Sequence, residues 1–299
     1  MKRLLLVTGL WPTPDMPSTG IFVKRRVSGQ PITVVAPRSY RGWMPLRYVS
    51  LSIRALSARG PFVGVEAHPL FPAGLIGLAA ARIRRVPLVV YAHGSDVRET
   101  AIENAFYRFL ARRVIRGAAA VVANSADTAA LVAQLGGSPI IIAPGVDLEL
   151  FKPSPRPSAR RVLYLGGTDP GKGFDVAGSL ADTLLGPGLR TLNSDEVAAA
   201  IAEHDIVLVP SRAEGYGLVA AEAIASGRWV VARNVGGLRE IVEDGVTGTL
   251  VNDDADFAEA IQNVPDYDPY LVAGHAAPLS VASANQAMAT VWERVSTRS

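Results

Sequence analysis

The sequence predicts an α/β protein with two doubly wound, Rossmann-like domains that face a central cleft. Three observations carry the fold class. Short apolar runs alternate with helical patterns along nearly all of the 299 residues, which is typical of βα units around a parallel sheet. The alternation pauses once, in the proline cluster FKPSPRPSAR at residues 151–160, and then resumes. A chain of this length can form about two domains, each with its own core.

The first series of units is predicted to form an N-terminal domain at residues 1–152. Its apolar runs lack polar alternation, as expected of buried parallel strands, and strands are predicted at residues 3–9, 31–37, 62–68, 86–94 and 118–125. Helices are predicted at residues 71–85, 97–117 and 125–136. In the last helix, Ser125 is placed as the N-cap and Gly136 as the stop.

The second series is predicted to form a C-terminal domain at residues 153–280. Strands are expected at residues 161–167, near Leu189, and at 205–211, 229–233 and 247–251. Helices are expected from about Lys172, at residues 195–204, in the alanine-rich stretch ending at residue 227, and at 256–264. A last helix within residues 281–299 is expected to pack back on the N-terminal domain.

Composition narrows the class of protein. A hydrophobic content of 49% and a charged content of 19% are those of a globular chain. The absence of cysteine excludes disulfides and thiolate metal sites. No apolar run reaches the ~18 residues of a membrane helix, and the start MKRLLLVTGL is interpreted as a first strand, not a signal peptide. We expect a cytoplasmic protein, peripheral at the membrane if its partner lies there.

The net charge of +3 hides an asymmetry between the two halves. Residues 1–150 contain 18 Lys/Arg and 8 Asp/Glu, whereas residues 151–299 contain 12 and 19. A basic first half favours an anionic partner, such as a phosphorylated glycan or lipid, a membrane surface or a modified nucleic-acid base. The alternative is a set of arginine-rich, solvated helices.

The stretch PSRAEGYGLVAAEAIASG at residues 210–227 combines groups that suit a nucleotide sugar. Free amide groups and the dipole at a helix N-terminus bind anions, and glycine lets a phosphate approach. Glu214 precedes the turn Gly215-Tyr216-Gly217-Leu218 and can accept hydrogen bonds from hydroxyl groups. Glu222 lies further along the helix, where it can hold a second pair of hydroxyls, as a ribose offers. The alternative is a capped helix with surface acids.

Other candidate residues follow strands of the first half. Gly20 lets a helix N-terminus face a phosphate, with Lys24 and Arg25 nearby. His93 and Asp96, in the run AHGSD, can hydrogen-bond sugar hydroxyls or move a proton at the carboxyl edge of the sheet. His68 ends another strand and is the weaker candidate, because a single histidine is more often structural.

Two further motifs have competing interpretations. GGTDPGKGF at residues 166–174 matches the glycine and lysine of a P-loop, but Gly173 stands where a magnesium-binding hydroxyl belongs. The alternative is a loop that presents Lys172 to a diphosphate as a point charge. NDDAD at residues 252–256 contains DxD, yet it precedes a predicted helix and is interpreted as N-cap and dipole charge. No metal site is predicted.

Together these motifs resemble the retaining glycosyltransferases of family 4, which have the GT-B fold. Glu214 and Glu222 match the Glu-x7-Glu motif of that family. The segments APGVDLELFKP (143–153) and RNVGGLREIVEDGVTGTLV (233–251) resemble its interdomain and C-terminal segments, and HGSD and NS (124–125) also match. The resemblance covers nearly the whole chain.

The resemblance implies a function and a site. The C-terminal domain would bind a nucleoside diphosphate sugar, such as a UDP- or GDP-hexose, as donor substrate, with no cofactor and no metal. Glu214 and the loop residues Gly215, Tyr216, Gly217 and Leu218 would hold the sugar and phosphate, and Glu222 the ribose. Lys172 and Gly20 would contact the diphosphate, and His93 the donor sugar; His93, Glu214 and Lys172 are the catalytic candidates. On the acceptor side the candidates are Asp96, His68, Lys24 and Arg25.

Two departures from the family pattern stand out. Gly167 occupies the position of a usual arginine, for which Arg212 is a candidate substitute on the donor. The stretch at residues 183–197 is shorter than usual, and nucleobase contacts often come from there. Three alternatives therefore remain open: a non-catalytic sugar-nucleotide-binding protein, a GT-B enzyme with another reaction such as epimerisation, and a P-loop-like nucleoside triphosphatase.

Overall fold

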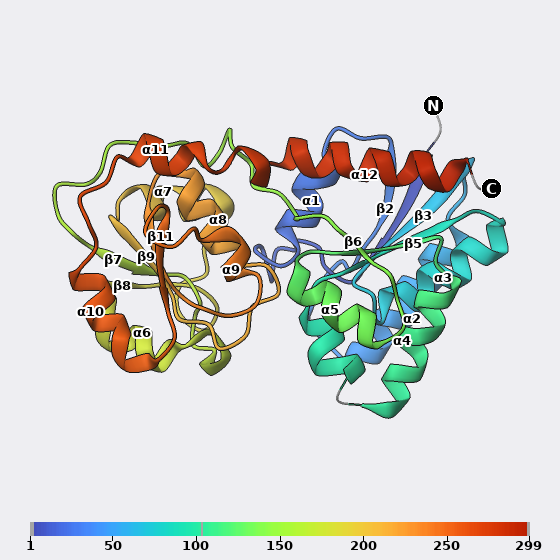
Figure 1. The fold of residues 1–299 in the computed structure, drawn as a ribbon. Helices are drawn as coiled ribbons and strands as arrows, with labels where there is room; N and C mark the ends of the chain where they lie inside the picture. The colour runs from blue at the N-terminus through green and yellow to red at the C-terminus, as the bar shows by residue number, and fades with distance from the viewer. Residues whose placement is uncertain (1–2, 103, 298–299) are drawn as a thin grey trace. The chain divides into compact units, whose positions relative to one another are not determined.

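The computed structural model describes residues 3–102 and 104–297, which form two compact units (Figure 1). Unit 1 comprises residues 1–143 and 284–299, and unit 2 comprises residues 144–283. Each unit is built on one parallel sheet with helices on both faces, so the predicted class of two doubly wound α/β domains is confirmed.

Unit 1 contains a six-stranded sheet in the order β2-β1-β3-β4-β5-β6. The strands are β1 (Arg3–Thr8), β2 (Ile32–Val35), β3 (Phe62–His68), β4 (Leu88–Ala92), β5 (Ala120–Ala123) and β6 (Ile140–Ile141). The helices are α1 (Ile21–Val27), α2 (Met44–Ser57), α3 (Ala73–Arg84), the π-helical turn η1 (Asp96–Ile102), α4 (Ala105–Gly117), α5 (Ala126–Gln134) and most of α12 (Val281–Ser296). The chain direction across the sheet reverses between β1 and β3, and ligands bind at such switch points in open α/β sheets.

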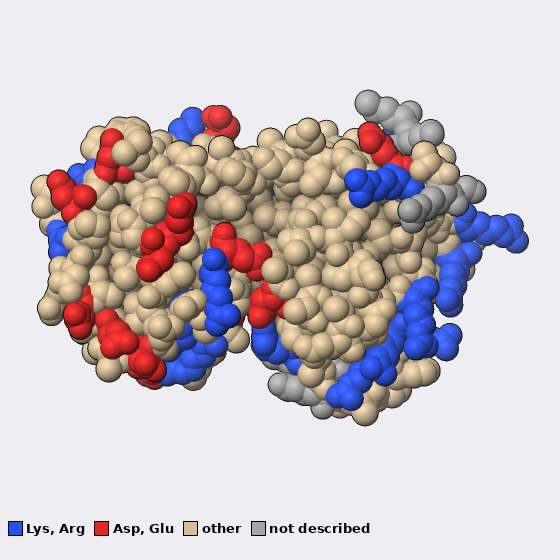
Figure 2. All heavy atoms as spheres, viewed as in Figure 1, with Lys and Arg blue, Asp and Glu red and all other residues tan. Residues whose placement is uncertain are grey.

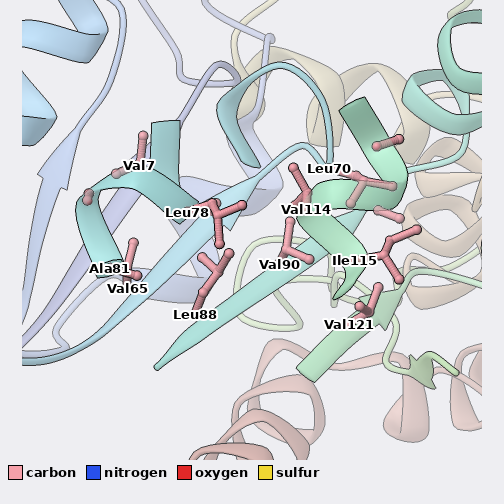
Figure 3. Packing of buried hydrophobic residues seen from close by; sticks show 14 of the residues in the cluster. Val7, Val65, Leu70, Leu78, Ala81, Leu88, Val90, Val114, Ile115 and Val121 are labelled. Carbon is pink, nitrogen blue, oxygen red and sulfur yellow. The ribbon is translucent and has the colours of Figure 1, made fainter. Parts of the chain in front are cut away.

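The two faces of the sheet in unit 1 have separate cores. Alternate strand residues such as Val7, Val65 and Val90 pack under α2, α3, α4 and α5 (Figure 3). The residues between them face the other side, where Tyr91 and its neighbours pack against four side chains of α12: Ala284, Met288, Val291 and Val295. Burial on both faces explains why these strands appear in the sequence as continuous apolar runs.

Most predicted elements of unit 1 are confirmed, with three corrections. The single helix predicted at residues 97–117 is instead two, because the Asn104 side chain accepts the amide hydrogens of Phe106 and Tyr107 and starts a new helix, α4. Helix α2 and the short strand β6 are not among the elements predicted from the sequence. The N-cap role of Ser125 is confirmed, since its hydroxyl oxygen accepts the Thr128 amide at 3.1 Å.

Unit 2 contains a five-stranded sheet in the order β11-β10-β9-β7-β8. The strands are β7 (Val162–Tyr164), β8 (Thr183–Leu184), β9 (Ile206–Val209), β10 (Trp229–Arg233) and β11 (Gly248–Val251). The helices are η2 (Pro170–Lys172), α6 (Phe174–Leu180), α7 (Ser194–Ala202), α8 (Leu218–Ala225), α9 (Leu238–Ile241), η3 (Asp254–Asp256), α10 (Phe257–Gln262), α11 (Pro269–Gly274) and η4 (Ala277–Leu279). Here the switch point lies between β7 and β9.

One prediction in unit 2 is wrong and another holds in part. No strand lies at Leu189: the strand is β8, and Leu189 instead closes a turn by donating its amide to the Gly186 carbonyl at 3.0 Å. The acidic run at residues 252–256 lies at the start of α10 as predicted, with Asp256 as the N-cap residue, but no side chain of the run makes a capping hydrogen bond. The carboxylate of Asp254 binds Arg233 and Arg212.

Candidate functional site

The switch point of unit 2 contains a cavity of about 270 Å³. It lies where the loops after β7 and β9 meet, and its polar lining includes Lys172, Ser211 and Glu214. The rest of the lining is apolar or backbone: Tyr164, Leu165, Gly166, Pro187, Leu208, Val209, Gly217, Leu218 and Val219. The cavity thus gathers four of the residues predicted from the sequence, namely Lys172, Glu214, Gly217 and Leu218.

Lys172 and Glu214 form an ion pair in this cavity. The Nζ atom of Lys172 lies 2.8 Å from the Oε2 atom of Glu214, with side chains 39% and 17% exposed. Lys172 ends the short helix η2, and its position is set by the turn after it, where Gly173 has φ of 75°. A Cβ atom at Gly173 would lie 2.4 Å from the Pro210 carbonyl oxygen, so only glycine fits here.

The loop after Glu214 leads into the N-terminus of α8. Gly217 is the N-cap residue with φ of 100°, and no side chain caps this helix end. A second glycine turn supports the loop: Gly237 donates its amide to the Glu214 carbonyl at 3.2 Å, and a Cβ atom on Gly236 would lie 1.9 Å from the same oxygen. The first amide groups of α8 are therefore held, without a protein cap, beside Lys172 and Glu214.

Of the remaining residues of the predicted motif, Tyr216 and Glu222 are buried and Gly215 is partly exposed. Glu222 is 4% exposed, within α8, and does not line the cavity as the structure stands. The Tyr216 ring packs in the interior at 7% exposure, and burial raises the pKa of its hydroxyl. Gly215 contributes backbone to the loop, with its carbonyl oxygen 2.7 Å from where a Cβ of Gly237 would stand.

Gly167 has a structural reason to be glycine. Its φ is 68°, and a Cβ atom there would lie 2.1 Å from the carbonyl oxygen of Pro187. The loop Gly186-Pro187-Gly188 fills this space, and the Thr168 amide donates to the same carbonyl at 2.9 Å. The shortened stretch after β8 and the missing arginine are therefore linked: the compact loop occupies the volume that a longer side chain would need.

Arg212 is not directed at the cavity. Its guanidinium donates to the Asp175 carboxylate at 2.7 and 2.8 Å and to the Pro170 carbonyl at 2.7 Å, with Asp254 at 3.4 Å. The hydrogen-bonded Arg212 guanidinium lowers the pKa of Asp175 to about 2. Arg212 thus joins the loops of unit 2, and the expectation that it replaces the missing arginine at the diphosphate has no support in this arrangement.

In unit 1, Gly20 begins α1 at the switch point between β1 and β3. Its φ is 67°, and a Cβ atom would lie 2.3 Å from the Leu10 carbonyl carbon, so the glycine allows two backbone segments to approach. Lys24 is exposed and Arg25 is half-buried on this helix. The third basic residue, Arg26, is 3% exposed and was missed in the sequence.

His68 and His93 form a hydrogen-bonded chain with Glu66, in which Glu66 and His68 are buried and His93 is partly exposed. The Nε2 atom of His68 lies 2.7 Å from Glu66 Oε1, and its Nδ1 atom lies 2.9 Å from His93 Nε2. Arg26 forms an ion pair with Glu66, and Trp292 of α12 donates its indole N–H to the other carboxylate oxygen at 3.3 Å. Burial and the nearby guanidinium hold the pKa of His68 well below its usual value, and burial does the same for His93, so both rings are neutral.

Asp96 has a structural role at the same edge of the sheet. Its carboxyl group accepts the amide hydrogens of Leu70 at 2.7 Å and His93 at 2.9 Å, which fixes the ends of β3 and β4 relative to each other. Burial raises the pKa of Asp96 to about 6. Asn124 adds a hydrogen bond from its amide to the His93 carbonyl at 2.9 Å.

Within residues 3–102 and 104–297, no cluster of three His, Cys, Asp or Glu side chains could hold a metal ion. The same part of the chain has no helix long and apolar enough to cross a membrane.

Four residues near the two switch points were missed in the sequence: Arg26, Glu66, Ser211 and Pro187. Glu66 alone left a signal, since a carboxylate inside the buried run FVGVEAH must be paired to be stable. Arg26 could not be distinguished from its neighbours Lys24 and Arg25, because a seven-residue helix gives too few positions to define its buried face.

Two family models cover most of the chain. Residues 6–144 match the model described as "Glycosyl transferase 4-like domain", and residues 155–265 match "Glycosyl transferases group 1". The chain belongs to the GT-B glycosyltransferases.

Curated relatives of this glycosyltransferase are named D-inositol 3-phosphate glycosyltransferases. That of Catenulispora acidiphila is 31% identical over 328 aligned positions, which cover 88% of this chain and 77% of the relative. That of Geodermatophilus obscurus is 34% identical over 239 positions, which cover 61% of this chain and 51% of the relative. The chain therefore spans about half to three quarters of the length of these relatives.

Solved structures share the fold of this glycosyltransferase over nearly its whole length. A sucrose-phosphate synthase from Thermosynechococcus elongatus has a TM-score of 0.81 at 17% identity and covers 100% of both chains. The HepE protein of Anabaena, crystallised with UDP and glucose, has a TM-score of 0.74 at 20% identity and covers 98% of this chain and 99% of its own.

Proposed function

We propose that the protein transfers a sugar from a nucleoside diphosphate sugar to an acceptor hydroxyl group, with retention at the anomeric carbon and without a metal ion. The observation that carries this proposal is the cavity of unit 2. There a lysine, a carboxylate and the uncapped N-terminus of α8 line one space at a sheet switch point. A diphosphate with a sugar attached has the charges and hydroxyl groups that match these three partners.

In the proposed reaction, the bond between the anomeric carbon and the diphosphate oxygen breaks, and a bond to the acceptor oxygen forms on the same face. The acceptor proton passes to an oxygen of the leaving diphosphate. Lys172 and the α8 amide groups stabilise the negative charge that develops on this leaving group. Glu214 accepts hydrogen bonds from sugar hydroxyls, and Glu222 binds the ribose.

For the acceptor we propose an anionic molecule that carries a phosphate. The excess of basic residues in the first half supports this class, and so do the relatives named D-inositol 3-phosphate glycosyltransferases. Lys24 and Arg25 on α1 are the proposed contacts, with Gly20 at the start of that helix. A cytoplasmic location stays a prediction from composition.

Thermal unfolding with UDP, GDP, ADP and dTDP and their common sugars tests the donor class. A ligand at about 100 times its dissociation constant should raise the free energy of unfolding by about 2.7 kcal/mol. We expect a shift with one base in the presence of EDTA. A shift only with ATP and magnesium would replace this proposal by the nucleoside triphosphatase. Donor binding without transfer to any phosphorylated acceptor would favour the non-catalytic alternative.

Salt tests the acceptor class separately. Exposed charges are screened at about 8 Å at physiological ionic strength, so the KM for an anionic acceptor should rise with salt while that for the donor changes less. The anomeric configuration of the product, read from its proton coupling, tests retention.

A further inference from the structure

Three neighbouring helices of unit 1, α2, α3 and α4, carry arginine but no acid. α2, α3 and α4 lie side by side on one face of the sheet, with α3 in contact with both others. Their sequences are MPLRYVSLSIRALS, AGLIGLAAARIR and AFYRFLARRVIRG, which contain eight arginines and no aspartate or glutamate. Figure 2 shows Lys and Arg side chains in a band along the part of unit 1 where α3 and α4 lie in Figure 1.

The outward faces of the same helices are apolar. On α2, Leu46, Val49, Ile53 and Leu56 follow a helical spacing opposite the buried Leu51 and are 61%, 55%, 61% and 39% exposed. On α3, Ile83 is exposed, and on α4 so are Phe106 and Phe109. These apolar residues and the exposed arginines together form one surface, which we call the cationic face. Its arginines are Arg82, Arg112, Arg113 and Arg116. α2 was missed in the sequence because it is apolar on two sides.

We propose that the cationic face docks on a lipid bilayer that contains anionic lipids. Apolar side chains on a helix that lies in the interface enter the acyl boundary, while arginines bind the negative headgroups. A second copy of this chain fits poorly, since a symmetric contact would set arginines against arginines. A nucleic acid fits the arginines but leaves the aliphatic stripe of α2 without a role, because bases stack on aromatic side chains. The docking surface is independent of the proposed donor chemistry.

Co-sedimentation of the full chain with vesicles tests this surface. We expect binding to vesicles of phosphatidylcholine mixed with phosphatidylglycerol and none to phosphatidylcholine alone. Val49→Asn with Ile53→Asn, and separately Arg113→Gln with Arg116→Gln, should each lower the partition coefficient roughly tenfold or more. The matched controls lie in unit 2: Tyr270→Asn with Leu271→Asn, which are 55% and 71% exposed, and Arg161→Gln with Arg190→Gln.

Three outcomes would overturn the docking proposal. The first is no binding to either vesicle, the second is an equal loss from the control variants, and the third is binding that survives in both variants of the cationic face. Light scattering measures whether the protein forms a dimer, and an RNA gel shift measures whether it binds RNA. If the protein binds no vesicles and forms a dimer that the α2 variant disrupts, the face is a contact between two copies of the chain. If it binds no vesicles but binds RNA, and the arginine variant loses that binding, the face is an RNA-binding surface.

A separate observation concerns which nitrogen of His93 carries the proton. Glu66 is ion-paired with Arg26, so its carboxylate accepts hydrogen bonds and the 2.7 Å contact requires a proton on Nε2 of His68. Arg26 also lies 3.4 Å from this Nε2 atom, but its guanidinium is paired with Glu66, and the shorter contact of Nε2 with the carboxylate decides the assignment. Nδ1 of the neutral His68 is then an acceptor, and the 2.9 Å contact requires a proton on Nε2 of His93.

We infer that Glu66, acting through His68, is a positioning residue that leaves Nδ1 of His93 as an unprotonated acceptor. This Nδ1 atom is buried and has no hydrogen-bond partner among the described residues. A hydroxyl group of a bound sugar could donate a hydrogen bond to this Nδ1 atom, and this part of the inference rests on the proposed function. The tautomer of His93 does not depend on the proposed function. Tyr91 stacks on His93 with ring centroids 4.8 Å apart and keeps the ring in this orientation.

The ¹⁵N shifts of the imidazole rings in the ligand-free protein test the tautomer. We expect His93 as the Nε2–H form over the pH range where the protein is folded. His68→Phe, and the double change Arg26→Met with Glu66→Met, which removes the ion pair without leaving a buried charge, should each produce a mixture of tautomers. His204→Phe in unit 2, another buried histidine, is the control. A His93 ring protonated at Nδ1, or unchanged in both variants, would refute the inference even if sugar transfer were confirmed.

Discussion

The Nζ atom of Lys172 lies 2.8 Å from the Oε2 atom of Glu214, so the cation proposed to meet a diphosphate is paired with the carboxylate proposed to meet the sugar. Half-exposed ion pairs of this kind stabilise a fold by about 0–1 kcal/mol. The ion pair therefore holds both side chains in the cavity, and a ligand that separates them costs little free energy.

Lys172→Ala should accordingly change the free energy of unfolding by less than about 1 kcal/mol and abolish most of the thermal shift caused by a nucleoside diphosphate. Lys152→Ala removes an exposed cation paired with Glu149 in the same unit and serves as the control. An unchanged diphosphate shift in Lys172→Ala would show that the lysine does not contact the donor.

Glu214→Gln and Glu222→Gln should separate turnover from affinity. Glu214 lines the cavity, so we expect its amide variant mainly to lower kcat. Glu222 is buried in α8, and we expect its variant mainly to raise the KM for the donor. Steady-state kinetics with varied donor measure both constants. Small and equal effects on kcat and KM in the two variants would contradict the assignment.

Gly167→Arg should not restore the missing cation. Its Cβ atom would lie 2.1 Å from the Pro187 carbonyl, and the residue would be held at a positive φ. We expect a loss of several degrees in Tm and no gain in diphosphate affinity, measured by calorimetry. Gly178→Ala, whose Cβ meets no atom within 4 Å, controls for glycine replacement in this unit. Tighter diphosphate binding with an unchanged Tm would contradict this prediction, because it would mean that the loop at residues 186–188 moves aside to accommodate the arginine.

The stability of unit 1 should depend on Asp96 between pH 4 and 6. The native carboxyl group has a pKa of about 6, against 3.8 for an ordinary aspartate, so in this window the native state binds more protons than the unfolded state. Its stability therefore falls as the pH rises, by about 3 kcal/mol in total. The side chain of the Asp96→Asn variant does not titrate. The free energy of unfolding of the variant minus that of the wild type should therefore rise by about this amount from pH 4 to 7. A difference independent of pH would contradict the raised pKa.

The sequence predicted the sheets well because strands buried on both faces leave a clear apolar signal. It predicted Lys172, Glu214 and Gly217 together because each lies in the segment that follows a strand, and parallel strands end at the same edge. The structure was needed where a contact distant in sequence decides the outcome. Arg212 is held by Asp175, and Gly167 is required by the Pro187 carbonyl; neither pairing leaves a local pattern.

The second core of unit 1 has a consequence for synthesis of the chain. Tyr91 and its neighbours in β4 and β5 are covered by residues 284–295 of α12, and Trp292 rests on Gly64, whose Cβ would lie 2.4 Å from the indole ring. All of unit 2 is translated between these partners. One apolar face of the first sheet thus stays uncovered during translation until unit 2 and α12 have been synthesised. A nascent chain arrested before residue 284 would expose that face to chaperones and to aggregation.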